Sequence, residues 1–445
     1  YGEEVYDLFR AVKNIFDPHD ILNPGIKLTS EPFTSHIDVE RVSGNCSSCG
    51  KCNAVCPVYG IRQEESNGPR GWLQIVTATG FSHDADGRAA EACVNCKSCI
   101  PACPVGIDIP AQILAKRTQR PNALAGRIFK LQSRTRLFES LLKWAGRLQP
   151  YWDRPLPRRM LDALSRPFLK ALGSGARLAP SLFIPRIATR SLRERFAELT
   201  EEQGARGEAA YFHGCAANYL DDGVGPSVID LLTKTGTRVV LPAQRCSGTP
   251  VETYGHKALV LENAQFNIRS LSRYKTVITG CASCTYMLRD YSRLFPDEKD
   301  RAGARDLGEK VVHITEYLEK NGIKLPHSAA TPGQRVTYHS SCHLKAAGVG
   351  REPRDLIKRI PGVEFVEMKD ADRCAGGAGT YIVRDFESSE AIFQRKREGI
   401  LESKAGIVAT SCPACMIRLK TGLNPKIRVQ HIAQLLNDAM GPKPS

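Results

Sequence analysis

Apolar residues recur every three or four positions through much of the first 172 residues, which is the spacing of amphipathic helices. The pattern predicts a helix from Glu3 to Ile15, ended by the proline- and glycine-rich turns that follow it. It predicts further helical faces across 124–148 and from Met160 to Leu172. Three prolines are expected to break the helices between these faces: Pro150, Pro155 and Pro157.

The C-terminal half has a different pattern, in which short apolar runs alternate with helical segments. The expected strands are 209–213, 237–241, 276–280 and 310–314, then 335–339, 363–368, 406–410 and 427–431. Such alternation predicts parallel sheets joined by helical crossovers. Cysteines follow several of the strands, so we expect them at the carboxyl edge of each sheet, where ligands bind in open α/β folds.

These cysteines belong to an internal repeat. The Cys215 set is Cys215, Cys246, Cys281 and Cys284, and the Cys342 set is Cys342, Cys374, Cys412 and Cys415. The intervals are 31, 35 and 3 residues in the first set and 32, 38 and 3 in the second. Each copy closes on a His-Ile pair, at His313 and at His431. We expect these two histidines to begin helices rather than to bind a metal.

Composition narrows the class of protein. The chain has 445 residues, a net charge of +15 and 16 cysteines, which excludes disorder, collagen and coiled coil and predicts several domains. No apolar run approaches the ~18 residues of a membrane span, and no leader-like segment opens the chain. Because the cysteines are clustered in a long chain, they indicate metal ligation in a reducing compartment, and we expect a cytoplasmic protein.

Most of the positive charge lies between residues 111 and 200, which hold 19 Lys or Arg and 5 Asp or Glu, a net charge of 19 − 5 = +14. Basic amphipathic helices of this kind can lie on an anionic membrane surface or on a partner. The favoured interpretation is that their apolar faces pack on neighbouring domains and their arginines are solvated. We expect no nucleic-acid contact, since no recognition fold accompanies the charge.

Two cysteine runs lie upstream of the basic segment. Cys46-x2-Cys49-x2-Cys52-x3-Cys56-Pro57 is followed by Cys93-x2-Cys96-x2-Cys99-x3-Cys103-Pro104. Each run resembles that of two-cluster bacterial ferredoxins. The resemblance implies two [4Fe–4S] clusters, one held by the Cys46 set (Cys46, Cys49, Cys52 and Cys103) and one by the Cys93 set (Cys93, Cys96, Cys99 and Cys56). Zinc is the alternative, but it usually uses pairs of CxxC.

Over 209–440 the repeat resembles the CCG cysteine-rich domains of heterodisulfide reductase and, more closely, those of glycolate oxidase and lactate-utilisation iron–sulfur subunits. Family members have two adjacent cysteines before a glycine. This chain keeps only the first of the two in each copy, in Cys246-Ser247-Gly248 and Cys374-Ala375-Gly376. A five-ligand cluster is therefore doubtful. Each copy is expected to hold one further iron–sulfur cluster or a zinc ion, with reactive thiols as the remaining alternative. His213, His339 and His343 flank these ligands.

The N-terminus carries a shorter resemblance. Phe16-Asp17-Pro18 and the segment 21–25 are similar to the C-terminal end of FAD-linked oxidases of the vanillyl-alcohol-oxidase type, which include D-lactate, glycolate and D-2-hydroxyglutarate dehydrogenases. The alternative is a generic helix and turn. The resemblance implies a flavin-binding domain that is not part of this sequence. It would lie in the same full-length polypeptide or in a partner subunit.

Together these features predict an α+β multidomain protein: a helical two-cluster ferredoxin-like domain, a helical connector, and two α/β parallel-sheet domains of the CCG type. The expected boundaries are 1–28 for the oxidase tail, 38–110 for the ferredoxin-like domain, 111–205 for the connector, and 206–325 and 333–440 for the two CCG-type domains.

The resemblances imply an oxidoreductase acting on CH–OH donors, of which this chain is the electron-transfer portion. D-2-hydroxyglutarate is the first expected substrate, with D-lactate or glycolate next, and the acceptor is a quinone or another oxidant. No catalytic or flavin-contacting residue is assigned. Two alternatives stay open: a heterodisulfide- or quinone-reductase-type subunit, and a C-terminal half that is a zinc-stabilised interaction module.

Overall fold

The computed structural model describes residues 2–22, 28, 46–77, 91–133, 135–199, 207–220, 223–326, 333–423, 425 and 427–441. The first element is α1 (Glu3–Phe16), as predicted. The Asp17 carboxylate closes the turn after it by accepting hydrogen bonds from the backbone N–H groups of Ile21 and Leu22, both at 2.8 Å. The predicted resemblance at 23–25 and the predicted start of the ferredoxin-like domain at 38 lie outside the described residues.

The described part of the ferredoxin-like region, residues 46–77 and 91–119, forms short helices around the cysteines. The helices are α2 (Lys51–Ala54), α3 (Pro57–Arg62), η2 (Glu65–Asn67), α4 (Pro69–Thr77), α6 (Cys99–Ala102) and α7 (Ile109–Gln119). Pro57 stands in the first turn of α3, where a missing N–H leaves no hydrogen bond unmade. Trp72, Leu73 and Ile113 are buried beside the cysteines and form the apolar core of this region.

The connector contains more helices than its pattern predicted. These are α8 (Ala123–Ser133), α9 (Thr135–Trp152), α10 (Pro155–Leu169) and α11 (Leu192–Leu199). The single face expected over 124–148 is therefore divided between α8 and α9. The predicted break at Pro150 is wrong, because α9 continues through it for two more residues. The missing Pro150 N–H removes one hydrogen bond, and the helix ends within a turn.

Two four-stranded parallel sheets form the C-terminal half, one in each copy of the repeat. The first contains β1 (Glu208–Phe212), β2 (Arg238–Val240), β3 (Val277–Thr279) and β4 (Val311–His313). The second contains β5 (Gln334–His339), β6 (Val363–Phe365), β7 (Ile407–Thr410) and β8 (Arg428–His431). Both have the same order, β2-β1-β3-β4 and β6-β5-β7-β8. The predicted parallel sheets are confirmed, and only β6 ends clearly before its predicted boundary.

Helices cover both sheets. They are α12 (Gly214–Tyr219), α13 (Val224–Lys234), α14 (Thr249–Thr253), α15 (Lys257–Leu271), α16 (Ala282–Arg289), η3 (Tyr291–Leu294), α17 (Glu298–Lys310) and α18 (Ile314–Asn321) in the first copy. In the second they are α19 (Cys342–Ala346), α20 (Glu352–Lys358), α21 (Tyr381–Arg384), α22 (Phe386–Glu402), α23 (Pro413–Leu423) and α24 (Ile432–Met440).

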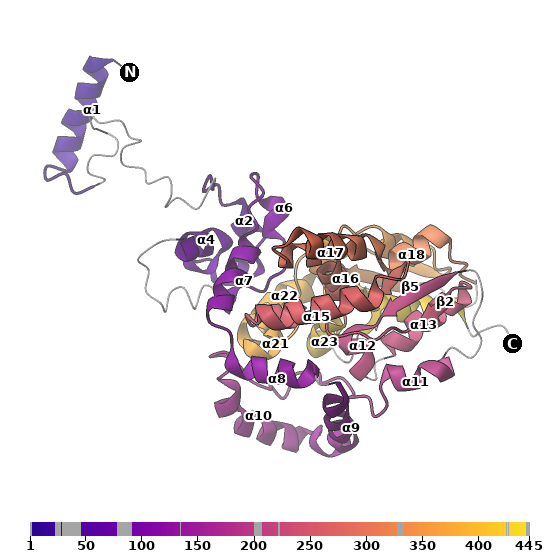
Figure 1. Cartoon of the computed structure of the whole chain (residues 1–445). Coiled ribbons are helices and arrows are strands. Elements are labelled where there is room, and N and C mark those ends of the chain that lie inside the picture. Colours follow the sequence, from indigo (N-terminus) through magenta and orange to yellow (C-terminus); the bar gives the residue numbers. More distant parts are fainter. Residues whose placement is uncertain are drawn as a thin grey trace.

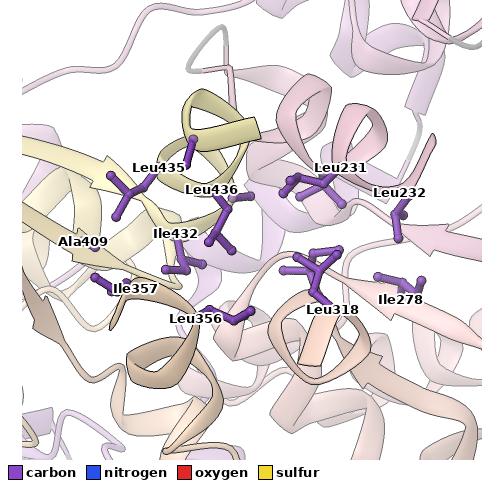
Figure 2. Close-up of a cluster of buried hydrophobic side chains, with 14 of the residues drawn as sticks. Leu231, Leu232, Ile278, Leu318, Leu356, Ile357, Ala409, Ile432, Leu435 and Leu436 are labelled. Carbon is purple, nitrogen blue, oxygen red and sulfur yellow. The ribbon is translucent and has the colours of Figure 1, made fainter. Parts of the chain in front are cut away.

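The two copies share one hydrophobic core. Helix α13 of the first copy packs on α24 of the second, and α20 of the second packs on α18 of the first, so the contacts are reciprocal. Figure 2 shows Leu231 and Leu318 of the first copy facing Ile432 and Leu436 of the second. All four side chains are completely buried. Burial of this common core fixes how the two sheets face each other.

The favoured interpretation of the basic connector is wrong for α9 and α10. Nine large apolar or aromatic side chains of these helices are 48–76% exposed rather than packed on a neighbouring domain. Figure 1 shows α9 and α10 along one edge of the molecule, on the side away from α17. The helical spacing identified an apolar face but not what covers it, which depends on tertiary packing.

Candidate metal centres

The cysteines of each C-terminal copy lie at the carboxyl edge of its sheet. Cys215 follows β1 and Cys281 follows β3, and these two strands are neighbours. The chain crosses from one side of β1 to the other at this point, which makes it the topological switch point where open α/β sheets bind ligands. Cys342 and Cys412 follow β5 and β7 in the same way.

The two copies bring their cysteines to one cavity of about 160 Å³. Its lining includes the complete Cys215 set and the complete Cys342 set, eight cysteines in all: Cys215, Cys246, Cys281, Cys284, Cys342, Cys374, Cys412 and Cys415. The sequence predicted a site in each copy. The structure places the two sites face to face, with Val94 and Asn95 of the ferredoxin-like region also in the wall.

Direct contacts join the two sets across the boundary between the copies. Cys281 of the first copy packs against the buried cluster that contains Cys412 of the second. Beside this pair the Ala282 N–H donates to the Ser411 carbonyl at 3.0 Å, and Ser283 Oγ lies 3.8 Å from Cys412 Sγ. The cysteines of one copy are therefore positioned partly by the backbone of the other.

Within each copy the first two cysteines also form a pair, Cys215 with Cys246 and Cys342 with Cys374. The hydrogen bond from Cys246 lowers the pKa of Cys215 to about 7, and the bond from Cys342 lowers the pKa of Cys374. The donor thiols have raised pKa values for the same reason. The two copies therefore place the lowered pKa on different members of the pair, on the first cysteine in the first copy and on the second cysteine in the second copy.

Glycine geometry supports these pairs. Gly248 and Gly376 follow their cysteines by two residues, and both have left-handed backbones, with φ of 106° and 81°. A Cβ on Gly376 would lie 2.6 Å from the Ser389 carbonyl oxygen. The Gly376 N–H instead points at Cys374 Sγ, 3.3 Å away. Backbone N–H groups aimed at thiolate sulfur are a feature of iron–sulfur sites, so the donor set fits a cluster.

His343 joins the three parts of the molecule. Its Nε2 lies 2.9 Å from the Asn95 carbonyl oxygen, and its Nδ1 lies 3.1 Å from Ser283 Oγ. Its ring also stacks on Tyr286 with the centroids 5.2 Å apart. Burial lowers the pKa of His343, so the ring is neutral at pH 7. A neutral ring with both nitrogens engaged is a structural bridge.

The other histidines are placed as follows. His313 and His431 cap α18 and α24, each accepting a hydrogen bond from the backbone N–H two residues later, which confirms that they begin helices. His213 Nδ1 lies 2.6 Å from the Gly214 carbonyl oxygen, and burial lowers the pKa of His213 to about 3. His339 is buried in the wall of the cysteine cavity.

In the ferredoxin-like region the structure groups the cysteines across the two runs. Burial raises the pKa of Cys56, and the neighbouring Cys96 and Cys93 raise it further, whereas the pKa of Cys52 is raised by burial and by Cys46 and Cys103. The resemblance predicts that the fourth ligands are exchanged between the same two groups, and this assignment stays a prediction. Cys46 and Cys52 pack against the buried cluster that contains Cys99 and the rest of the Cys93 set. The Cys46 and Cys93 sets are therefore adjacent.

The loops between these cysteines repeat an unusual backbone. Ser48 and Asn95 occupy equivalent positions and both have φ of 53°, and Gly50 and Lys97 are equivalent with φ of 74° and 63°. The Asn95 N–H points at Cys93 Sγ, 3.4 Å away. Left-handed residues turn the chain tightly around a centre, and the amide directed at sulfur suits an anionic cluster.

The Cys93 set also reaches the C-terminal cavity. Cys96 and Cys374 lie in one buried cluster with Cys342 packed against it, so the Cys46 and Cys93 sets and the C-terminal cavity form one continuous row of cysteines. A second cavity of about 680 Å³ opens beside this junction, lined by Cys96, Lys97 and Cys342. Sequence reasoning missed Asn95, Lys97 and Ser283, because no motif marks residues that join separate domains.

Zinc and iron–sulfur clusters both bind cysteine thiolates, and each four-cysteine set supplies the number of ligands that either would need.

Known family models match three parts of the chain. The model of the CCG cysteine-rich domain matches residues 209–289 and 336–420, and the 4Fe-4S dicluster domain matches 43–107. The C-terminal domain of FAD linked oxidases matches 1–26. These matches confirm the predicted CCG and dicluster character and support association with a flavin oxidase.

Individual relatives agree. The chain is 29% identical over 433 residues to the probable glycolate oxidase iron-sulfur subunit of Bacillus subtilis, covering 90% of this chain and 95% of that one. It is 27% identical over 420 residues to a fumarate reductase (CoM/CoB) subunit of Methanothermobacter marburgensis, covering 90% and 73%. Lactate utilization protein A of a Geobacillus strain is 30% identical over 237 residues, covering 52% and 99%.

The matched regions contain all 16 cysteines of the row, and two of the relatives are by name an iron-sulfur subunit and a reductase subunit. The chain therefore belongs to the family of CCG cysteine-rich proteins that includes lactate utilization protein A, and it is an iron–sulfur oxidoreductase component that transfers electrons.

Proposed function

We propose that this chain is the electron-transfer portion of an FAD-dependent D-2-hydroxyacid dehydrogenase, with D-2-hydroxyglutarate as the first substrate and D-lactate or glycolate next. The observation that carries the proposal is the continuous row of cysteine sets. The Cys93 set lies between the Cys46 set, whose Cys52 packs against its cluster, and the C-terminal cavity, whose Cys374 belongs to the same cluster.

Each cysteine set has a defined part in this proposal. The Cys46 and Cys93 sets hold one [4Fe–4S] cluster each, and the Cys215 and Cys342 sets hold one further cluster each. Iron–sulfur clusters supply one-electron acceptance and donation, which separates the electron pair that a flavin takes from a hydroxyacid. The flavin belongs to an oxidase domain whose C-terminal segment is residues 1–28, and the final acceptor is a quinone or another oxidant.

The chain's own groups serve this relay by orientation and exclusion of water. Amides of Asn95 and Gly376 point at sulfur, and His343 fixes the ferredoxin-like loop against both C-terminal copies. Burial of Cys56, Cys93, Cys96 and Cys99 keeps water from the Cys93 set. Low solvent exposure and directed amides are among the features that set cluster potentials.

The test begins with the full chain purified without oxygen and loaded with iron and sulfide. We expect iron and sulfide in excess of eight atoms each, from about two cubanes and the C-terminal sites, and electron paramagnetic resonance signals after reduction. Cys99→Ala should remove the signal of the Cys93 set, and Cys49→Ala that of the Cys46 set. Stoichiometric zinc with no iron in the wild-type chain would contradict the proposal.

Substrate class is tested with the FAD-linked oxidase partner added. Bleaching of the cluster absorbance by D-2-hydroxyglutarate, faster than by D-lactate or glycolate, is the expected result. If none of the three hydroxyacids bleaches the clusters while dithionite still reduces them, the electron-transfer function stands and the proposed substrate class is wrong.

One observation favours a second candidate, a reductase of the heterodisulfide or quinone type. The 160 Å³ cavity between the two copies is lined by eight thiols, which could act on a bound disulfide or quinone. This candidate predicts that Cys246→Ala or Cys374→Ala abolishes reduction of such a compound while the two ferredoxin-type signals stay intact. If both variants still reduce the disulfide or quinone, this second candidate function is wrong.

A further inference from the structure

Helices α9 and α10 expose a regular row of apolar and aromatic side chains, called the apolar stripe below. Its members are Leu137, Leu141, Trp144, Leu148, Tyr151, Leu156, Met160, Leu164 and Phe168. They are spaced by three or four residues along each helix, so each helix presents them on one side. The most exposed, Leu164, shows 76% of its surface. Adjoining apolar side chains at this exposure mark an interaction surface.

The charged side chains around the stripe are of one sign. Among the described residues between 137 and 170, every exposed charged side chain is basic: Arg147, Arg154, Arg159, Arg166 and Lys170. The Arg147 guanidinium lies 5.7 Å from the centre of the Trp144 ring, within the stripe itself. Cations therefore flank the apolar side chains on both helices.

The acidic residues of these helices and of the turn between them are buried or half-buried, and each is paired with an arginine. Glu139 accepts a hydrogen bond from Arg193 at 2.9 Å, and Asp153 lies 3.2 Å from Arg158. Asp162 is buried and bonded to Arg177 at 2.7 Å, with Arg166 at 2.8 Å. The outer face thus has apolar groups and positive charge without exposed negative charge.

The charge decides between the occupants of this face. A second copy of the chain would bring the same cations against each other, and like charges across an interface are repulsive. None of the described helices is long and apolar enough to cross a bilayer. An amphipathic pair with Leu, Trp and Phe exposed and arginines beside them matches helices that lie in the plane of an anionic membrane.

We propose that the apolar stripe and its flanking cations dock this chain on the surface of an anionic lipid bilayer. Trp144 and Tyr151 occupy the polar boundary, where aromatic side chains of mixed character are favoured. The arginines meet lipid phosphates, and the leucines enter the acyl region. This inference rests on α9 and α10 alone and stands whether or not the proposed substrate class is correct.

The experiment is flotation of the full chain with vesicles of phosphatidylcholine, either pure or with roughly 30% phosphatidylglycerol. We expect binding to the anionic vesicles to exceed binding to neutral vesicles by about 10-fold, and to weaken at about 0.5 M salt because surface charge is screened. Trp144 emission should shift to shorter wavelength on binding, and Trp144→Phe should remove that shift.

Two variants test the stripe. Leu141→Glu with Leu164→Glu should reduce anionic-vesicle binding by at least about 10-fold, since carboxylates on the apolar face oppose both insertion and charge attraction. Leu401→Glu is the matched control, because Leu401 is similarly exposed at 52% on α22. Circular dichroism and cluster absorbance check that each variant folds.

Three outcomes would overturn the proposal. The first is no binding to anionic vesicles by the wild-type chain. The second is equal loss of binding in the stripe variant and in Leu401→Glu. The third is stripe-dependent self-association in ultracentrifugation without vesicle binding, which would assign this face to a second copy.

Discussion

Lys97 is a buried side chain with little to neutralise it. It is 2% exposed, and its Nζ makes no hydrogen bond to any described residue. The nearest carboxylate oxygen, from Asp108, is 3.9 Å away, and the Tyr286 ring centre is 5.7 Å away. Its backbone is left-handed where the equivalent residue of the other run is Gly50. A strained cation between two cysteines of the Cys93 set is suited to offset the negative charge of a cluster.

Replacing Lys97 by glycine should separate the effect of its positive charge on the cluster from the strain of its left-handed backbone. Lys97→Gly removes the cation, so we expect the reduction potential of the Cys93 cluster to fall by on the order of tens of millivolts. The free energy of unfolding should not decrease and should gain up to about 1 kcal/mol from relief of the left-handed backbone. Redox titration and denaturant unfolding measure the two quantities.

Lys345→Gln is the matched control for Lys97. Lys345 lines the same 680 Å³ cavity, but its side chain is 53% exposed, so water screens its charge. The potential should move much less in this variant. Equal shifts in the two variants would contradict the role given to Lys97.

The buried thiols of the Cys93 set predict a pH dependence of the metal-free chain. Burial raises the pKa of Cys96 to about 12 and also raises the pKa values of Cys56 and Cys99. Because these thiols have a higher pKa in the folded chain than in the unfolded chain, they favour the folded state below the ordinary thiol pKa. This stabilisation is lost as the pH rises toward the pKa of the folded chain. Chelated protein should therefore lose up to about 1.4 kcal/mol per pH unit for each such thiol above about pH 9.

Urea unfolding of the chelated chain at a series of pH values checks this sign. The variant with Cys56, Cys96 and Cys99 all replaced by serine should have a flatter profile over that range. Bound metal requires the thiolate form, so the loaded protein should behave oppositely and lose its clusters in acid. A metal-free chain that becomes more stable above pH 9 would contradict the argument.

At the scale of elements, the strands of the repeat could be predicted closely. Buried parallel strands appear as short continuous apolar runs, and turns or cysteines bound them, so observed and predicted limits of β1 and β7 differ by one residue. The helix starts at His313 and His431 were also predicted, and their caps confirm them. Local hydrogen bonding and burial on both faces determine these features.

The connector shows where such prediction fails. Pro150 was expected to end a helix, but one proline near a helix end removes a single hydrogen bond and the turn survives. The apolar faces of α9 and α10 were expected to be covered. Periodicity shows that a helix has an apolar side, but the neighbours that cover it come from distant parts of the chain.

The shared core between α13 and α24 gives a prediction for the repeat. Leu436→Ala should lower the free energy of unfolding by about 2–5 kcal/mol, because the side chain is fully buried and its removal leaves a cavity. Leu401→Ala, at an exposed leucine, should change it by about 0.5 kcal/mol or less. Denaturant unfolding compares the two, and similar losses would show that the two copies do not depend on this core.

At the scale of the whole molecule, the sequence predicted each cysteine set but not how the sets meet. The grouping of Cys56 with the Cys93 set came from resemblance, and spacing alone does not impose it. The single cavity shared by the Cys215 and Cys342 sets depends on how α13, α18, α20 and α24 pack. No local pattern records a contact between segments more than a hundred residues apart.

His343 should affect electron transfer from the ferredoxin-like region to the C-terminal site. His343→Phe keeps a ring that can stack on Tyr286 but removes the bonds to Asn95 and Ser283. We expect the ferredoxin-type clusters to reduce at the wild-type rate, and electron transfer onward to the C-terminal site to slow. Stopped-flow absorbance with freeze-quenched spectra measures both steps, and Tyr317→Phe, remote from the cysteines, serves as a control. Unchanged onward transfer would make the bridge dispensable.

The reciprocal packing of α13 on α24 and of α20 on α18 has an evolutionary consequence. Two domains with the same strand order that exchange equivalent contacts have the arrangement of a two-fold symmetric dimer written into one polypeptide. A half-length ancestor with a single cysteine set would pair with itself and bring both sets to the symmetry axis. In the present chain the two halves differ in this respect: Cys374 and Cys342 of the second copy pack with Cys96 of the ferredoxin-like region, so a pseudo-symmetric pair of sites has one asymmetric neighbour.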